Sequence, residues 1–312
     1  MLLHKYLKIM ILGWAICSGA IHSTALAQPG KSGLSFLKLG VSARGLSMAD
    51  AMSAHVTGSS ATFYNPAGLP VAQLANSTSQ LTVMHKEWIQ DTRTEFLGAS
   101  ALLDEENAIG FSINSTTISD IEIRTRPGPS EGTFTARNFS FGASYGRILS
   151  EQIRVGITAK FLYEKILIDE ASGFAVDIGT QYQTPIENLS VGAVLANLGG
   201  MSTLRNEKSS LPTLLRIGPG YSTELVNISS DLTLASDLVY VFPENRSYVS
   251  LGGELLFSQT IAARAGYRFG SDGRGFTTGI GVQYSIIFVD YAFAPLSADL
   301  GNTHTISLSL NL

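Results

Sequence analysis

Apolar and polar residues alternate along most of the chain, in short segments that are separated by turn residues. The last segment is the clearest, because Ile306 and Leu308 alternate with Ser307 and Ser309. A strand with this period of two has one apolar face and one polar face. A series of such segments, each of about ten residues, is typical of a membrane β-barrel.

The pattern predicts fourteen strands. They are expected at residues 77–89, 91–103, 106–118, 133–148, 152–168, 171–184, 187–198, 211–223, 226–240, 246–257, 260–270, 275–285, 286–294 and 302–311. Bacterial outer-membrane barrels have an even number of antiparallel strands. The predicted fold is therefore all-β, a 14-stranded antiparallel outer-membrane β-barrel with an N-terminal hatch, and the predicted location is the cell outer membrane.

The connections between the predicted strands alternate in length. Longer ones, near 119–132 and 199–210, follow odd-numbered strands, whereas short ones such as Ser150-Glu151 follow even-numbered strands. Outer-membrane barrels have long loops outside the cell and short turns in the periplasm. This alternation predicts that both ends of the chain lie on the periplasmic side.

One long segment, residues 36–69, lacks the alternation. It contains a helix-compatible run over residues 43–54 and closes on Asn65-Pro66-Ala67-Gly68, whose residue types favour turns. A barrel of fourteen strands is too wide for its own side chains to fill, since about eight strands already reach that limit. We therefore predict that residues 28–72 form a hatch inside a transmembrane barrel of residues 73–312.

The first 27 residues have the features of a secretory signal peptide. Lys5 and Lys8 precede an apolar stretch, and Ala25-Leu26-Ala27 is a suitable cleavage site. A membrane anchor is the alternative interpretation of this stretch. The lone cysteine, Cys17, lies within the predicted signal peptide, so the mature chain can form no disulfide.

Composition excludes several classes of function. Charged residues make up 15% of the chain, against about 25% in soluble proteins, and the mean hydropathy is +0.19. Beyond residue 27 no apolar run reaches the roughly 18 residues of a transmembrane helix. Cleavage of the predicted signal peptide removes Lys5 and Lys8 and leaves a formal net charge of −6. The remaining sequence has no basic cluster, so no nucleic-acid partner is expected.

Motifs for catalysis lack their structural context in this sequence. It contains no His-x-x-x-His and no phosphate-binding loop, and its one Gly-x-Ser-x-Gly, at residues 142–146, falls inside a predicted strand and not at a strand-to-helix turn. We therefore predict that the protein is not an enzyme, with no catalytic residue, no metal ligand and no cofactor.

Seven charged residues fall on the polar faces of the predicted strands. They are Arg154, Lys160, Asp177, Glu254, Arg264, Arg268 and Asp290. A charge that faces lipid at the membrane midplane costs about 2–4 kcal/mol, so these side chains are expected to point into the lumen. One interpretation is a lattice that holds the hatch, with Arg44 pairing with an acidic member. The other is a polar conduit or a site for a ligand headgroup.

Two motifs carry a resemblance to a known family. They are FLKLGVSARGLSMADA, from Phe36 to Ala51, and SATFYNPAGL, from Ser60 to Leu69. With an exported fourteen-strand pattern, they make the chain similar to the PorV/PorQ family of outer-membrane proteins, relatives of the FadL-type fatty-acid transporters. The resemblance implies a FadL-like barrel with an N-terminal hatch. It also implies a role in type IX secretion, in which the barrel receives folded cargo through the cargo's C-terminal signal domain.

The functional hypothesis is a PorV/PorQ-type barrel that acts in protein secretion or surface display, in contact with membrane lipid. Its partners would be cargo C-terminal domains or the secretion translocon. The alternative is a FadL-like passive transporter of hydrophobic small molecules, and a purely structural barrel is a third possibility. The hatch motif Arg44, Asn65, Pro66, Ala67 and Gly68 either shifts to open a path or docks the hatch to the wall as a fixed turn.

Overall fold

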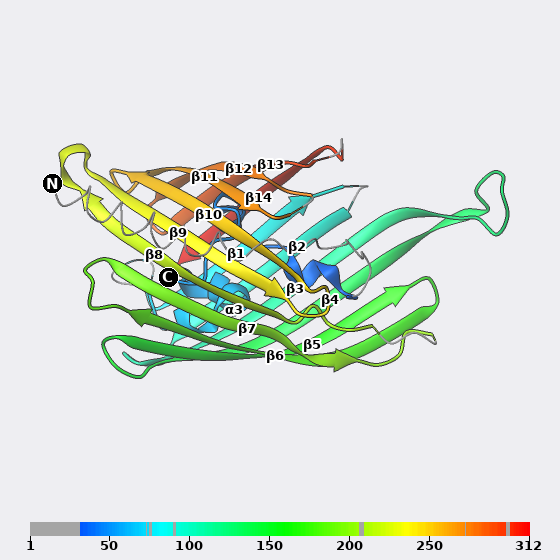
Figure 1. The fold of residues 1–312 in the computed structure, drawn as a ribbon, viewed down its shortest axis with the longest axis horizontal. Helices are drawn as coiled ribbons and strands as arrows, with labels where there is room; N and C mark the ends of the chain where they lie inside the picture. The colour runs from blue at the N-terminus through cyan, green and yellow to red at the C-terminus, as the bar shows by residue number, and fades with distance from the viewer. Residues whose placement is uncertain are drawn as a thin grey trace.

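The computed structural model describes residues 32–72, 74, 77–89, 92–205, 209–271, 273–297 and 300–312. Its strands form one closed antiparallel barrel, in which β1 pairs with β14 (Figure 1). The strands are β1 (Ser79–Glu87), β2 (Thr92–Leu102), β3 (Asn107–Ile123), β4 (Gly132–Ile148), β5 (Ile153–Ile166), β6 (Asp169–Gln183), β7 (Leu189–Met201), β8 (Leu214–Leu225), β9 (Ser230–Val241), β10 (Arg246–Phe257), β11 (Ile261–Phe269), β12 (Phe276–Tyr284), β13 (Ile287–Pro295) and β14 (Asn302–Asn311). The predicted fold class is confirmed.

The wall has the two faces that the alternation predicts. In β14, Ile306 and Leu308 are exposed on the outside, whereas Thr305 and Ser307 are buried on the inside. The same division runs around the barrel, where the exposed outer residues are mostly Ile, Leu, Val, Phe and Tyr. The outer surface is therefore an apolar band suited to lipid.

Strands β3 and β4 extend well beyond the rest of the barrel as a hairpin arm (Figure 1). The sequence predicted a strand over 106–118 and a loop over 119–132, and that boundary is wrong. A bulge at Asp120, whose φ is 56°, lets Ile121 pair with Phe134 and continue the ladder. The bulge and the polar and turn residues of this segment interrupt the period of two. The sequence pattern therefore did not show that the strand continues.

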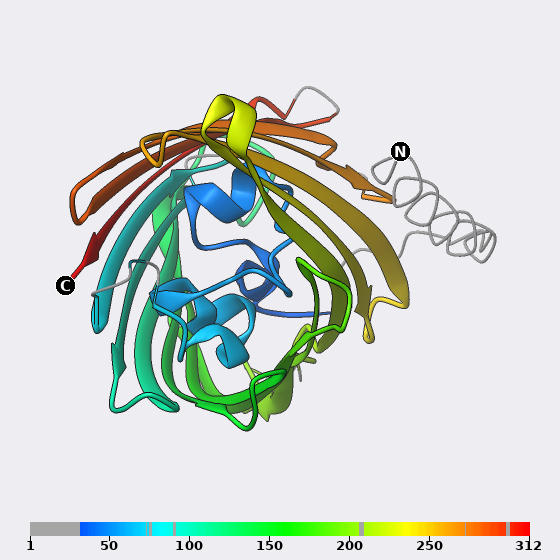
Figure 2. The ribbon, with the colours of Figure 1, turned by 90° about the vertical axis from the view of Figure 1, so that its left-hand side faces the viewer.

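The described segment before β1 contains short helical elements, and Figure 2 shows them inside the ring of strands. They are η1 (Ser35–Lys38), α2 (Ala43–Ser47), η2 (Gly58–Ser60), α3 (Ala61–Tyr64) and η3 (Pro66–Gly68); η4 (Val226–Ile228) lies in the β8–β9 connection. In the described residues, no helix is long and apolar enough to cross a membrane.

The helix-compatible run over residues 43–54 forms a helix only as far as Ser47. The Ser42 side chain caps α2 by accepting a hydrogen bond from the Gly45 N–H. Ala49 and Asp50 then have φ values of 54° and 63°, which turn the chain out of the helix. Propensity favoured a longer helix, but the turn brings the Asp50 carboxylate to partners elsewhere in the lumen.

Connection lengths identify the two ends of the barrel. The longest connections, 124–131 and 202–213, follow odd-numbered strands, and those at the other end are five residues or fewer. The first end is therefore the extracellular one and the second the periplasmic one. Leu312 lies at the periplasmic end, where its carbonyl accepts a hydrogen bond from the Thr78 N–H. The predicted signal peptide, residues 1–27, lies outside the described residues.

Candidate functional site

The described residues 32–72, called the hatch below, pass through the whole lumen. At the extracellular end the Gly33 N–H donates to the Ser210 carbonyl, and the Ser32 hydroxyl donates to Glu244 in the β9–β10 connection. The sequence predicted that both ends of the chain lie on the periplasmic side, but the first described residues, 32 and 33, lie at the extracellular end. The strand alternation fixes only where the hatch joins β1, and it carries no information about the path before that point.

The extracellular part of the hatch is apolar. Leu34, Phe36 and Leu37 are buried in a cluster with side chains of the wall. The other members of this outer apolar cluster are Leu39, Leu162, Ala171, Ala175, Met201 and Leu211, with Trp88 and Leu204 packed against it. Hydrophobic contact of this kind has no directional requirement, so one apolar group can replace another.

Lys38 ends this part with a charged contact. Its ammonium pairs with the Glu244 carboxylate, which also accepts the Ser32 hydroxyl. Burial raises the pKa of Glu244, but the Lys38 ammonium and the Ser32 hydroxyl outweigh that effect and lower it below its usual range. We call these three residues the outer clasp.

The middle of the hatch packs against a ring of glycines on the inner wall. At Gly252 an added Cβ would lie 2.6 Å from the Met48 Cβ, and at Gly156 it would lie 2.6 Å from the Ala67 nitrogen. The glycine ring comprises Gly98, Gly110, Gly146, Gly156, Gly179, Gly192, Gly220, Gly252, Gly266 and Gly279, one from each of ten strands. Missing side chains in the wall thus let the hatch backbone approach the strand backbones.

The Asn-Pro-Ala-Gly motif joins the hatch to β6. The Asn65 Oδ1 accepts from the Ala67 N–H at 3.2 Å, and Pro66 begins η3. The Asn65 amide donates to the Ser53 carbonyl at 2.8 Å and to the Thr180 carbonyl at 3.0 Å. Ala67 and Gly68 complete this buried turn, and a Cβ on Gly68 would collide with the Val56 carbonyl. The geometry is that of a docking turn, and whether it shifts stays a prediction.

All seven predicted charges are on inward-facing positions, and three of them form one network with Arg44 of the hatch. The Arg44 guanidinium binds Glu254 with two bonds of 2.9 and 2.7 Å. Glu254 also accepts from Arg264 at 2.5 Å, and Arg264 donates to Asp290 at 2.6 Å. The network links the hatch to β10, β11 and β13, and it satisfies charges that burial would otherwise penalise.

The other predicted charges lie apart from that network. Lys160 pairs with Asp177 at 2.5 Å, and Arg268 donates to Asp50 of the hatch at 2.8 Å. Arg154 faces inward at the periplasmic end and is half-buried; among the described residues no carboxylate pairs with it. The seven charges therefore do not form one conduit.

Several hatch contacts involve residues that the sequence analysis missed. Tyr64 donates to Asp50 at 2.8 Å, and Asp237 accepts from the Met52 and Ser53 N–H groups at 2.9 and 3.0 Å. The Lys86 ammonium donates to the Gly40 carbonyl at 2.7 Å and is fully buried. Lys86 and Asp237 stand an even number of residues from inward-facing neighbours on their strands. The alternation of the sequence could therefore have predicted that both point into the lumen.

A cavity of about 330 Å³ lies below the hatch at the periplasmic end. Arg44, Glu254, Arg264 and Asp290 line it together with His55. The lumen is thus divided into an apolar extracellular part, a packed middle and a polar periplasmic vestibule. No group of His, Cys, Asp and Glu within the described ranges is arranged to hold a metal ion.

No protein-family model matches the chain, and no curated protein sequence matches it. Solved structures do match. The CymD monoaromatic hydrocarbon channel has a TM-score of 0.64 at 14% identity, covering 88% of this chain and 98% of that one. The Pseudomonas putida toluene transporter TodX has a TM-score of 0.59 at 12% identity, covering 86% and 96%.

A Pseudomonas aeruginosa FadL homologue also matches, with a TM-score of 0.53 at 9% identity, covering 87% of this chain and 98% of that one. At such identities the likeness shows a common fold. The chain therefore has the FadL-like barrel fold, and its closed barrel and apolar outer band make it an outer-membrane protein. The PorV/PorQ assignment and the absence of enzyme activity stay predictions.

Proposed function

We propose that the protein passes hydrophobic small molecules across the outer membrane, with the hatch as a plug that has to shift during passage. The observation that carries the proposal is the outer apolar cluster, placed at the extracellular mouth directly above the packed hatch. A hydrophobic solute that reaches the mouth gains burial there. The fold is that of barrels that carry monoaromatic hydrocarbons and toluene, which supports the proposal by analogy.

The hatch blocks direct passage, because its backbone or side chains pack against the glycine ring on ten strands. Hydrogen bonds and ion pairs depend on a particular partner at a particular distance, so they are lost when that partner moves. Apolar contacts can form again with another apolar group. Movement of the hatch therefore has to break contacts such as Arg44–Glu254 or open a path beside them. The polar vestibule below gives the displaced residues room and water.

The test is a disulfide that fixes the hatch to the wall. The Ser59 Oγ of the hatch lies 2.8 Å from the Thr82 Oγ1 of β1, so cysteines at both positions place two sulfurs within bonding reach. Thr94 and Thr116 provide the control, because their Oγ1 atoms are 2.9 Å apart and both belong to the wall. Uptake of labelled toluene and labelled oleate is measured in vesicles that contain each variant, oxidised and reduced.

We expect uptake above that of protein-free vesicles, abolished by oxidation of the Ser59/Thr82 pair and restored by reduction. Oxidation of the Thr94/Thr116 pair leaves uptake unchanged. Uptake equal to that of protein-free vesicles would contradict transport. Uptake that survives the oxidised hatch disulfide would contradict hatch movement while leaving transport intact.

The cargo-binding role implied by the PorV/PorQ resemblance stays a separate prediction. No observation on the described part of the chain favours it over small-molecule transport. Deleting the gene and measuring surface-protein display beside solute uptake separates the two functions. Unchanged display in the deletion strain would contradict a role in secretion.

A further inference from the structure

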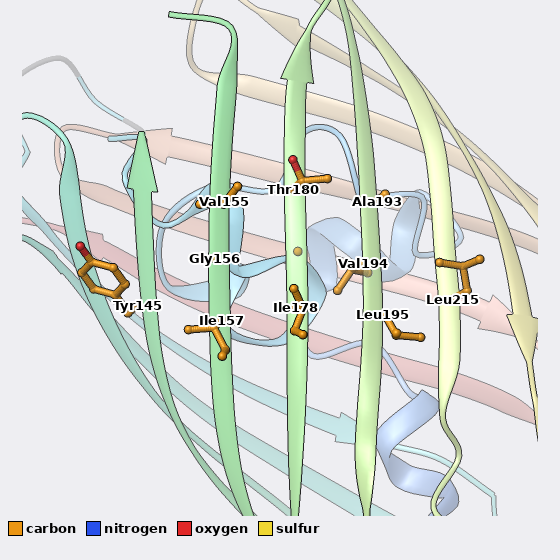
Figure 3. A pocket seen from close by; sticks show the side chains of 11 residues that line it. Tyr145, Val155, Gly156, Ile157, Ile178, Thr180, Ala193, Val194, Leu195 and Leu215 are labelled. Atoms are coloured by element: carbon orange, nitrogen blue, oxygen red, sulfur yellow. The ribbon is translucent and has the colours of Figure 1, made fainter. Parts of the chain in front are cut away.

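The outer face of the barrel has an apolar groove over β4 to β8, with a volume of about 480 Å³ (Figure 3). One side of the groove is a row of large side chains in register across five strands. The row consists of Tyr145, Ile157, Ile178, Leu195 and Leu215. The neighbouring row is smaller, with Val155 paired to Thr180 and Thr180 paired to Ala193. The step in side-chain size between the rows makes the groove.

The floor of the groove is bare backbone. Gly156 and Gly179 are paired in register between the two rows, and an added Cβ on either would point into the lumen, so the missing side chains thin the wall from the inside. The hatch lies directly behind it: a Cβ on Gly179 would lie 3.0 Å from the Pro66 Cδ. The Thr180 carbonyl accepts from Asn65, while its side chain lines the groove. One layer of peptide therefore separates the groove from the hatch, and the wall is thin here.

The two hydroxyl groups at the groove are already bonded to the barrel. Thr180 donates to the Arg154 carbonyl at 3.0 Å, and Tyr145 donates to the Asn107 side chain at 2.5 Å. Ile157 and Ile178 expose 46% and 52% of their surface on the same face. No charged side chain lines the groove. It therefore offers an occupant only apolar contact.

The position of the groove on the barrel indicates what kind of molecule occupies it. The groove is part of the lipid-facing band, and Tyr145 at its edge lies three residues before the periplasmic end of β4. The hydrocarbon region of a bilayer holds no water to fill such a space, and an empty groove would leave its lining without contact atoms. We propose that this groove binds an acyl chain of a phospholipid from the periplasmic leaflet, which covers the wall over the Asn65-Pro66 turn.

The proposal does not depend on transport, and wild-type protein tests it first. The protein is reconstituted with a phospholipid that carries a photoreactive diazirine in its acyl chain, and labelled peptides are identified by mass spectrometry. We expect residues 145–215 to be labelled more strongly than the outer face of β11 to β13, which exposes Ile261, Ile280 and Val289. Even labelling of the two faces would overturn the proposal.

Substitutions that fill the groove provide the second measurement. Ala193→Phe, with Thr180→Phe as a second variant, is expected to lower phospholipid retained after detergent exchange by about tenfold, the effect of losing the burial of two methylene groups. Val282→Phe, on the lipid-facing side of β12, leaves retention unchanged. Folding is checked by the heat-dependent shift in electrophoretic mobility. Unchanged retention in both groove variants, retained lipopolysaccharide instead of phospholipid, or cross-links between two copies through the groove would each overturn the proposal.

Discussion

The two parts of the hatch are held in different ways. Residues 34–39 are buried by apolar contact and fastened by the outer clasp, whereas residues 43–67 add to an apolar cluster of their own the glycine ring, the Arg44–Glu254 network and the Asp50 and Asp237 bonds. Apolar contact tolerates replacement by another apolar molecule, while buried ion pairs require their own partners. The comparison indicates that a hydrophobic solute competes with the first part and that the second part sets the barrier to opening.

The largest effect is expected from Glu254→Ala. It leaves the half-buried Arg44 guanidinium and the buried Arg264 guanidinium without their shared carboxylate, which costs about 3–5 kcal/mol. The temperature of the electrophoretic mobility shift falls, and proteolysis of the hatch accelerates. The control is Glu106→Ala, which breaks an exposed pair with Arg147 and costs less than about 1 kcal/mol. Equal shifts for both variants would show that the network does not hold the hatch.

Leu37→Ala tests the apolar part and is expected to cost about 2–5 kcal/mol, because it opens a cavity in the outer apolar cluster. An apolar cavity of this kind binds small hydrocarbons. Added toluene should therefore restore part of the lost stability in Leu37→Ala but none in Glu254→Ala. Rescue of both variants, or of neither, would contradict the difference between the two parts of the hatch.

Gly252→Ala tests the glycine ring. The new Cβ meets the Met48 Cβ at 2.6 Å, and overpacking of this kind costs about 1–3 kcal/mol. Gly253→Ala, the next residue, is the matched control, because its nearest neighbour is the end of the Leu234 side chain at 3.5 Å. Hydrogen exchange of residues 47–52 should rise only in Gly252→Ala. Equal exchange in the two variants would mean that the hatch does not depend on this contact.

The smallest effect concerns the outer clasp and its pH dependence. Since the pKa of Glu244 is lowered on folding from its usual 4.5, its contribution to stability is full above that value and is lost as the pH falls through the folded-state pKa. The protection factor of the Gly33 N–H, in which the intrinsic pH dependence of exchange is divided out, should therefore fall on acidification. Glu244→Gln should lower this protection factor already at pH 6, by the equivalent of less than about 1 kcal/mol. Glu122→Gln in the hairpin arm is the control, and an unchanged Gly33 rate in Glu244→Gln would contradict the clasp.

The barrel was predictable because each strand carries its own signal. Ile306, Leu308 and their partners alternate within a single segment, and the inward charges followed from the same parity. The hatch gives no such periodic signal. Arg44 has two inward-facing carboxylates within reach of its part of the lumen, and only strand tilt and register decide for Glu254 over Asp290. The glycine ring was hidden for the same reason, since its members meet only after ten strands are aligned.

The glycine ring also constrains the order of assembly. A hatch that touches inward-facing glycines on ten strands, and that donates from the Ala43 N–H to Ser307 on β14, leaves no space through which a chain of this bulk slides into a finished cylinder. We expect the sheet to curl around a hatch that is already compact. The eight residue pairs between β1 and β14 then close last, as the final step of biogenesis.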